Sequence, residues 1–266
     1  MLAGKRLTVA SPVPDWHREP MTAADSPPPL VAIERAALFL DFDGTLVALA
    51  DRPEDISVSS QLPDLLERAA ARLGGRLALL TGRALADLDS RLGCGRLAAA
   101  GSHGLELRAG AAPPRTAPAP PGLAAARAAL AAFAEGDSGL LLEDKPAGVA
   151  LHYRLAPGRE REALALAEAL AARGGLALQR GKMVVELLAA GADKGAALES
   201  LMAEPPFAGA RPVAVGDDLT DEHAFRAAAA MGGFGVLVGD SRETAARYRL
   251  ADVDAVHAWL AALLHG

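Results

Sequence analysis

The stretch LFLDFDGTL, residues 38–46, places two aspartates directly after a short apolar run. The run predicts a buried strand, Gly44 permits a sharp turn after it, and Thr45 adds a hydroxyl group. In an open parallel sheet, ligands bind outside the carboxyl ends of the strands. We therefore expect Asp41 and Asp43 at a ligand-binding edge, although a single aspartate after a strand is also typical of a turn or a helix cap.

Three more apolar runs are each followed by a helical stretch. They cover residues 76–80, 212–215 and 235–238. Strands that alternate with helices are typical of βα units and a parallel sheet. The outer parts of the chain, 34–107 and 186–266, are therefore predicted to form one α/β core domain.

The sequence between residues 108 and 185 has a different texture. It opens with a proline-rich stretch and continues with alternating apolar and polar residues, which are typical of an antiparallel sheet with one covered face. The predicted elements are helices at 123–134 and 160–173 and strands at 148–155, 176–179 and 183–187. We therefore predict an α/β fold in which a parallel-sheet core carries an inserted α+β module at 108–185.

Two further polar clusters are expected near the same edge. Thr81, Gly82 and Arg83 end the second predicted strand, where they offer a hydroxyl and free amides. Lys194 begins a helical stretch, although the dipole of a helix favours an anion at that end. This position predicts a phosphate or carboxylate partner for the lysine.

The carboxylates of Asp217, Asp218 and Asp221 lie close together after the predicted strand at 212–215. They repel one another unless a cation or ordered donors compensate. Hard oxygen ligands without a cysteine or histidine pair favour Mg²⁺ over zinc. We expect Asp217 to bind this metal together with Asp41 and the backbone carbonyl of Asp43, and we expect Asp218 and Asp221 to orient them.

Together these residues predict phosphoryl transfer. Asp41 would attack phosphorus to give an aspartyl phosphate, while Mg²⁺ and Lys194 offset charge on the transferring group. Asp43 would protonate the leaving oxygen and then take a proton from the hydrolytic water. Thr81 would hold a phosphoryl oxygen, which completes the predicted catalytic set.

Composition excludes several other classes of protein. The 266 residues carry a net charge of −6 without a basic cluster, which argues against nucleic acid and polybasic membrane contacts. No apolar run reaches the ~18 to 20 residues of a membrane span. The single cysteine, Cys94, fits a reducing compartment, so we expect a cytoplasmic protein, and we expect a monomer. Residues 1–33 are predicted to be a disordered extension.

Four motifs of this sequence resemble those of the haloacid dehalogenase-type phosphatases, and they occur in the same order: DFDGT, TGR, a lysine before glycine, and GDDLTDE. The resemblance implies a Rossmann-type core with an inserted cap domain that determines substrate specificity. In that superfamily the second aspartate of the first motif, here Asp43, marks the phosphatases. The resemblance therefore implies hydrolysis of a phosphate ester.

GSHGLELR at 101–108, LEDKPAGVALHYR at 142–154 and GKMVVEL at 181–187 further resemble the trehalose-6-phosphate phosphatase family, and the likeness extends over nearly the whole chain. It implies a small-molecule substrate, trehalose 6-phosphate, and the products trehalose and inorganic phosphate, as the last of two steps in trehalose synthesis. The sequence departs from the family pattern at Leu188 and Ala189, where relatives usually have a basic residue followed by proline. This departure falls at the hinge between cap and core.

The same resemblance implies which residues bind the substrate. They are Asp41, Phe42, Asp43, Thr81, Gly82, Arg83, His103, Glu143, Lys145, Arg154 and Glu186. The cap members of this set would grip the glucose hydroxyls, with His152 beside them, because a disaccharide needs several donors and acceptors to be recognised. Without the resemblance, Glu143 and Lys145 are more typical of an exposed pair on a strand.

Two other functions stay open at this point. One is another phosphosugar phosphatase, acting on sucrose 6-phosphate, mannosyl-phosphoglycerate or a monosaccharide phosphate. The grouping of Glu143, Lys145 and Arg154 favours trehalose 6-phosphate over these. The other is a catalytically silent phosphosugar-binding regulator, for which loss of Asp41 or Asp43 is expected, and both are present.

Overall fold

The computed structural model describes residues 26–30, 33, 35–50, 55–93, 95–145, 148–191 and 193–265. Cys94 and most of the predicted disordered extension (1–33) lie outside these residues. The described end of that extension packs on the protein, since Ile33 is fully buried in the core and the indole Nε1 of Trp259 donates a hydrogen bond to the backbone oxygen of Pro28 (3.1 Å). The prediction of disorder is therefore wrong for this part of residues 1–33.

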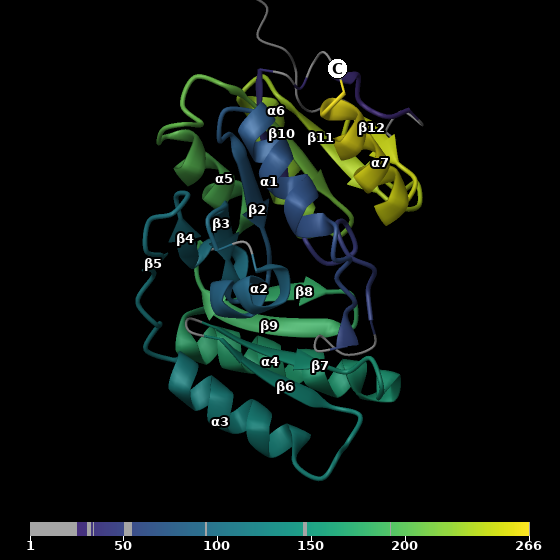
Figure 1. Cartoon of the computed structure of the whole chain (residues 1–266). Coiled ribbons are helices and arrows are strands. Elements are labelled where there is room, and N and C mark those ends of the chain that lie inside the picture. Colours follow the sequence, from purple (N-terminus) through teal and green to yellow (C-terminus); the bar gives the residue numbers. More distant parts are fainter. Residues whose placement is uncertain are drawn as a thin grey trace, which may run out of the picture.

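A large sheet of eight strands forms the upper part of the molecule in Figure 1. Its strands, in spatial order, are β12 (Tyr248–Leu250), β11 (Phe234–Val238), β10 (Arg211–Gly216), β1 (Ala36–Leu40), β2 (Leu77–Leu80), β3 (Ala98–Gly101), β4 (Glu106–Arg108) and β5 (Arg115–Thr116). The pairings from β12 to β3 are parallel, and those of β4 and β5 are antiparallel. The predicted parallel-sheet core is confirmed.

Helices cover both faces of the large sheet. One face carries α1 (Leu62–Arg72), α2 (Leu85–Leu92) and α7 (Val253–Leu263), and the other carries α5 (Lys194–Met202) and α6 (Asp221–Ala230). Strand β1 explains why the sequence reads as a continuous apolar run, because all five residues are buried. Leu38 and Leu40 belong to the first core cluster and Phe39 to the second, as the alternation of side chains along a strand requires.

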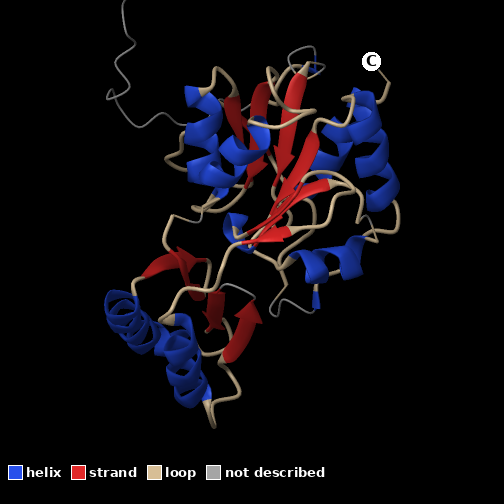
Figure 2. Cartoon of the chain, turned by 90° about the vertical axis from the view of Figure 1, so that its left-hand side faces the viewer, coloured by secondary structure: helices blue, strands red, loops and turns tan. Residues whose placement is uncertain are grey.

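A smaller antiparallel sheet lies below the large one (Figures 1 and 2). Its order is β6 (Leu141–Lys145), β7 (Gly148–His152), β9 (Val184–Ala189) and β8 (Leu176–Gly181), and one face is covered by α3 (Leu123–Ala134) and α4 (Glu160–Gly174). Val149, Leu151, Val185 and Leu187 point into the apolar cluster under these helices. The predicted alternation, with one face covered, is confirmed.

The chain passes from one sheet to the other at different residues from the predicted domain boundaries, 107/108 and 185/186. Strand β5 belongs to the large sheet, and β9 stays in the small sheet to its end at Ala189. Leu188 is fully buried there and clusters with Leu105, which follows β3 in the chain. Leu188 therefore gives an apolar contact between the two parts.

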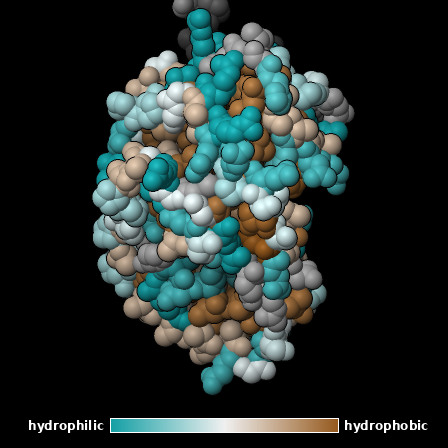
Figure 3. Space-filling model, in the orientation of Figure 1, coloured by the Kyte–Doolittle hydropathy of each residue, from teal (hydrophilic) through white to brown (hydrophobic). Residues whose placement is uncertain are grey.

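No helix among the described residues is long and apolar enough to cross a membrane. On the face shown in Figure 3, hydrophilic side chains surround separate, small hydrophobic patches. Within the described residues, the large exposed apolar side chains are Leu49, Leu155, Leu219 and Met231.

Candidate active site

Asp41 lies at the end of β1, at the centre of the large sheet, and its side chain is buried. Lys194, the first residue of α5, donates hydrogen bonds from Nζ to Oδ1 of Asp41 (2.6 Å) and to Oδ1 of Asp221 (2.7 Å). Burial raises the pKa of Asp41 above its usual value, and Lys194 only partly offsets this effect. The two carboxylates in turn raise the pKa of Lys194, against the effect of its burial, so the lysine stays charged. The lysine therefore has the carboxylate partners that its place at the helix start predicted.

Three carboxylates, those of Asp41, Asp217 and Asp221, bring one oxygen each within 4.8 Å of one another. Burial, followed by the charge of Asp221, raises the pKa of Asp217 to about 6. A β-carbon at Gly44, whose φ is +86°, would lie 2.3 Å from Oδ2 of Asp217, so only glycine lets this turn approach the carboxylate. Hard, crowded oxygens with a surplus of negative charge fit a Mg²⁺ ion.

The structure thus groups only three of the five predicted metal residues through their carboxylates. The side chain of Asp218 accepts a hydrogen bond from the backbone amide of Leu219 (2.6 Å), and its own amide donates to Oδ2 of Asp221 (3.0 Å). Asp221, expected only to orient other ligands, has its carboxylate within the group itself. The expected ligand atom of Asp43 was its backbone carbonyl, and its carboxylate has another partner.

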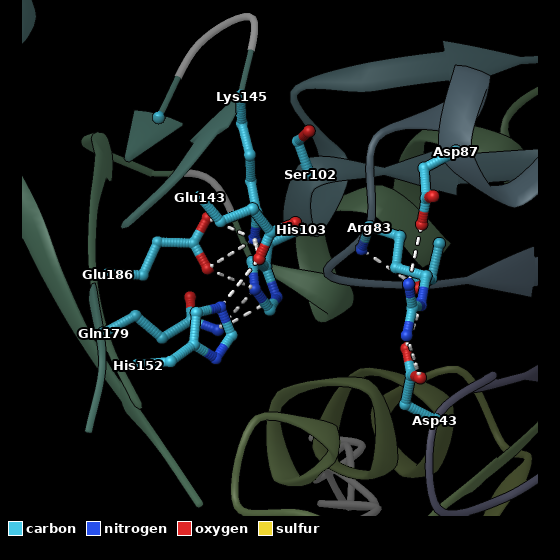
Figure 4. Close-up of polar contacts among 12 residues, drawn as sticks. Asp43, Arg83, Asp87, Ser102, His103, Glu143, Lys145, His152, Gln179 and Glu186 are labelled. Atoms are coloured by element: carbon cyan, nitrogen blue, oxygen red, sulfur yellow. Dashed lines mark hydrogen bonds and ion pairs between the residues drawn. The ribbon is translucent and has the colours of Figure 1, made fainter. Parts of the chain in front are cut away.

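That partner is Arg83, at the end of β2. Its Nε and Nη2 donate to the two carboxylate oxygens of Asp43, both at 2.7 Å, and its Nη1 donates to Asp87 at 2.7 Å (Figure 4). A two-pronged guanidinium contact fixes the orientation of a carboxylate as well as its position. The arginine predicted to bind substrate therefore also holds the predicted acid–base residue.

The other members of the TGR motif serve mainly to shape this edge. Thr81 is buried, and its hydroxyl accepts a hydrogen bond from the backbone amide of Arg83 (3.1 Å). Gly82 leaves space for a neighbouring ring, because a β-carbon there would lie 2.7 Å from Nε2 of His103. Phe42, predicted to bind substrate, has a fully buried side chain in the core of the large sheet. Its side chain is therefore not available to a ligand.

The open face of the small sheet carries the predicted sugar-binding residues. Strand register places Glu143 opposite Ala150, Ala150 opposite Glu186, and Glu186 opposite Gln179, so these side chains share one face. The small Ala150 separates the two glutamates.

Glu186 is held on this face by Lys145, whose Nζ donates to both carboxylate oxygens at 3.0 Å. Both side chains are about 95% buried. Burial acts to raise the pKa of Glu186, but Lys145 and His103 outweigh it and lower that pKa to about 2. Beside this pair, a carboxylate oxygen of Glu143 lies 2.8 Å from Nε2 of His152. Burial acts to raise the pKa of Glu143, but His152 and Lys145 outweigh this effect and lower that pKa. These residues form a connected polar network, whereas an exposed pair would have contributed little.

His103 reaches this network from the large sheet. It lies in the short 3₁₀ turn Ser102–Gly104 after β3, and its Nε2 is 2.9 Å from Oε2 of Glu186. Figure 4 shows its ring beside Glu186 and Gln179, with Arg83 and Asp43 on the other side of the site. The two sheets therefore meet at a polar contact.

A cleft with a cavity volume of about 170 Å³ lies between the two sheets. The predicted residues that line it are Asp41, Asp43, Gly82, Arg83, His103, Glu143, Lys145, His152, Arg154, Glu186, Lys194, Asp217 and Asp218. Thr81, Phe42 and Asp221 do not line it.

Several residues that shape the site were not predicted. Gln179 bonds to His103, and Asp87 anchors Arg83. Glu222 is buried and pairs with Arg242, whose Nη2 also donates to the backbone oxygen of Asp218 (3.0 Å). Glu222 had a local signal, because it lies within the GDDLTDE stretch, and Asp87 lies only four residues after Arg83. Gln179 and Arg242 are brought in by distant parts of the chain.

Comparisons with known proteins agree with this geometry. The family model described as trehalose-phosphatase matches residues 39–254. A probable trehalose-phosphate phosphatase of Sinorhizobium fredii is 42% identical over 209 residues, which are 78% of this chain and 79% of that protein. The trehalose-6-phosphate phosphatase of Escherichia coli is 37% identical over 226 residues, which are 84% of this chain and 85% of that protein.

Solved structures show the same architecture. A crystal structure of a trehalose-6-phosphate phosphatase related protein superposes with a TM-score of 0.73 at 25% identity, covering 86% of this chain and 96% of that chain. The C-terminal domain of the Candida albicans trehalose-6-phosphate phosphatase gives a TM-score of 0.74 at 21% identity, covering 89% and 95%. The second likeness concerns the fold alone.

Proposed function

This chain belongs to the trehalose-phosphatase family, and from that premise we propose that it hydrolyses trehalose 6-phosphate to trehalose and inorganic phosphate with the help of Mg²⁺. The observation that carries the proposal is the pairing of two sites across one cleft. Asp41 and its buried lysine lie on one side, and the network around Glu186 lies on the other. A phosphate joined to a sugar is the kind of ligand that such a cleft fits.

Asp41 is the proposed nucleophile. One of its carboxylate oxygens forms a bond to phosphorus, and the bond between phosphorus and the sugar oxygen breaks, leaving an aspartyl phosphate. Lys194 keeps its positive charge beside Asp41, because the nearby carboxylates raise its pKa, and so it offsets charge on the attacking group.

Asp43 is the proposed acid and base. In its protonated form it gives a proton to the departing sugar oxygen, and it then takes one from the water that attacks the aspartyl phosphate. Both carboxylate oxygens of Asp43 accept hydrogen bonds from Arg83 in this structure, so one of these bonds has to open when Asp43 takes up its proton. Arg83 is in turn fixed by Asp87, so the acid–base group is supported by two further side chains.

Asp41, Asp217 and Asp221 would hold the Mg²⁺ ion, with Asp218 nearby. The ion supplies positive charge for the phosphoryl oxygens when it is bound. The chain already provides a buried set of hard oxygens whose charge exceeds that of Lys194. A divalent cation therefore balances this set.

Glu143, Lys145, Glu186 and Arg154 are the proposed contacts to the disaccharide. Charged donors and acceptors that are fixed in a network distinguish one arrangement of hydroxyl groups from another, because a mismatched sugar leaves them unpaired. The same side chains line the cleft beside Arg83 and Asp43. The sugar would thus sit where its phosphate reaches Asp41.

The test is release of phosphate from trehalose 6-phosphate, sucrose 6-phosphate, mannosyl-phosphoglycerate and glucose 6-phosphate, each with Mg²⁺ and with a chelator. We expect Mg²⁺-dependent release with a strong preference for trehalose 6-phosphate. Equal rates on all four would keep the chemistry and reject the substrate. No release from any of them would favour the silent phosphosugar-binding regulator.

We also propose that the protein acts as a monomer in the cytoplasm. The monomer is checked by light scattering on the purified protein at several concentrations, and a mass of twice the chain would reject it. The location is checked by fractionating cells that produce the full chain.

A further inference from the structure

Two neighbouring residues beside the active site adopt a backbone conformation that favours glycine. Ser102 has φ +47° and His103 has φ +54°, and both side chains are buried. Non-glycine residues rarely occupy this region, and each such residue costs on the order of 1 to 3 kcal/mol, which contacts with its surroundings must offset. Strain of this kind points to a role for the side chains that it presents.

The surroundings do impose this conformation. The backbone amide of Ser102 donates to the oxygen of Arg83 (2.8 Å), and that of His103 donates to the oxygen of Thr81 (3.1 Å). The hydroxyl of Ser102 donates to buried Glu106 (2.8 Å). The strained turn is thus bonded to the strand end that carries the TGR motif.

The imidazole ring of His103 reaches from this turn into the small sheet. Nε2 lies 2.9 Å from Oε2 of Glu186, and the side-chain nitrogen of Gln179 lies 2.9 Å from Nδ1. Gly82 makes room for the ring, since a β-carbon at that position would lie 2.7 Å from Nε2. His103 therefore contacts the two neighbouring strands β8 and β9 at once.

The hydrogen bonds also specify the form of the ring. If the amide of Gln179 donates to Nδ1, then Nδ1 accepts and Nε2 carries the proton that it donates to Glu186. Both ring nitrogens then have a hydrogen-bond partner. It occupies one side of Glu186 while Lys145 occupies the other, so the carboxylate is fixed from both sheets.

We propose that His103 is a positioning residue that ties Glu186 to the large sheet and so sets the distance between the sugar-binding face and Asp41. The inference rests on the proposed function, in which Glu186 contacts the disaccharide. His103 acts through Glu186 and takes no part in the transfer of the phosphoryl group. The expected consequence is a selective effect on substrates that carry the sugar.

Two substitutions distinguish the roles of the two ring nitrogens of His103. In His103→Gln the amide nitrogen can reach the place of Nε2 and donate to Glu186, whereas in His103→Asn the shorter amide reaches only the place of Nδ1. Asparagine tolerates a positive φ better than glutamine does. The two variants are thus expected to rank in opposite orders for stability and for sugar binding.

The measurement is kcat and KM for trehalose 6-phosphate and for p-nitrophenyl phosphate, which has no sugar, together with the melting temperature. For His103→Asn we expect KM for trehalose 6-phosphate to rise about 10- to 100-fold, as for a misplaced binding group, while kcat/KM for p-nitrophenyl phosphate falls by a clearly smaller factor. His103→Gln should recover most of the lost affinity despite a lower melting temperature. Equal losses on both substrates, or affinity that follows the melting temperature, would overturn the proposal.

A second measurement does not depend on the identity of the sugar. Hydrogen exchange of the backbone amides of β8 and β9 should be faster in His103→Asn than in the wild type and close to wild type in His103→Gln. If the wild type shows no preference for trehalose 6-phosphate, the proposed substrate is rejected. The exchange measurement still tests whether His103 holds Glu186 in place. Unchanged exchange in His103→Asn would overturn the positioning role.

Discussion

The two sides of the cleft both bury a lysine among carboxylates, but their charge balance differs. Lys194 stands against Asp41, Asp217 and Asp221, and burial raises the pKa of Asp41 and Asp217. On the small sheet, Lys145 and His103 lower the pKa of Glu186 to about 2, against the effect of its burial. The first cluster is short of positive charge and fits a divalent cation, whereas the second is internally compensated.

That difference explains why each cluster suits its proposed ligand. A surplus of carboxylates binds a cation and places it beside a phosphate. A compensated network has no strong need for an ion and instead presents donors and acceptors to uncharged hydroxyl groups. Substitutions on the two sides should therefore fail in different ways, and four predictions test this contrast.

The largest effect is expected for Asp41→Asn. The substitution keeps the volume and removes the nucleophile, so kcat should fall by about 10⁴-fold or more on every phosphate ester. Phosphate release measures the loss, and the melting temperature shows that the fold is kept. Substantial turnover of any ester by the pure variant would contradict the assignment of Asp41.

Lys194→Met should follow in size. It leaves Asp41 and Asp221 buried without their shared cation, so we expect a loss of about 3 to 5 kcal/mol in the free energy of unfolding and about 10²- to 10³-fold in kcat. Urea unfolding and phosphate release are the measurements. Arg68→Met, which breaks an exposed pair with Asp64 on α1, is the matched control and should change stability by less than about 1 kcal/mol. A loss no larger than that of the control would count against the cluster.

The compensated cluster predicts a dependence of stability on pH. The folded-state pKa of Glu186, about 2, lies below its ordinary value of 4.5, so its contribution is fully present above about pH 5 and is lost as the pH falls toward 2. The difference in unfolding free energy between the wild type and Glu186→Gln should shrink by about 2 kcal/mol between pH 6 and pH 3. Urea unfolding at several pH values measures it. A constant difference would show that Glu186 is not held by Lys145 and His103 in solution.

The smallest effect is expected for Glu143→Ala. It removes one side chain at the edge of the network, so kcat/KM for trehalose 6-phosphate should fall by about 10-fold, and that for p-nitrophenyl phosphate should change little. Glu168→Ala, which removes an exposed partner of Arg180 on the same part of the chain, is the control and should leave both values unchanged. Equal losses on the two substrates would remove Glu143 from the sugar-binding face.

The contrast between the two sides also decides how far the sequence could predict the site. Asp41 and Asp217 were predictable because each follows an apolar run, and parallel strands end at one edge of the sheet. Helix α3 was predicted with the observed bounds, since its alanines and leucines carry a strong helical signal. The local rules were sufficient wherever a residue's place follows from the strand or helix that it ends or begins.

The remaining contacts depend on distant parts of the chain. The strands at 176–179 and 183–187 were predicted as a pair, but not that Glu186 lies opposite Gln179, because register is not visible in a single strand. Nor did the sequence show that Arg83 holds Asp43, since either could have faced a ligand alone. The packing of Ile33 was missed for the same reason, because its apolar partners lie far along the chain.

Strand β9 carries Glu186 and leads after a short connection to α5, whose first residue is Lys194. Only seven residues separate the glutamate at the sugar from the lysine at the nucleophile. A change in the length of this connection would displace one against the other, whereas exchanging side chains on the open face of the small sheet would not. Relatives of this protein that bind other sugars should therefore differ by substitutions on β6 to β9. They should have no insertions or deletions at residues 187–193.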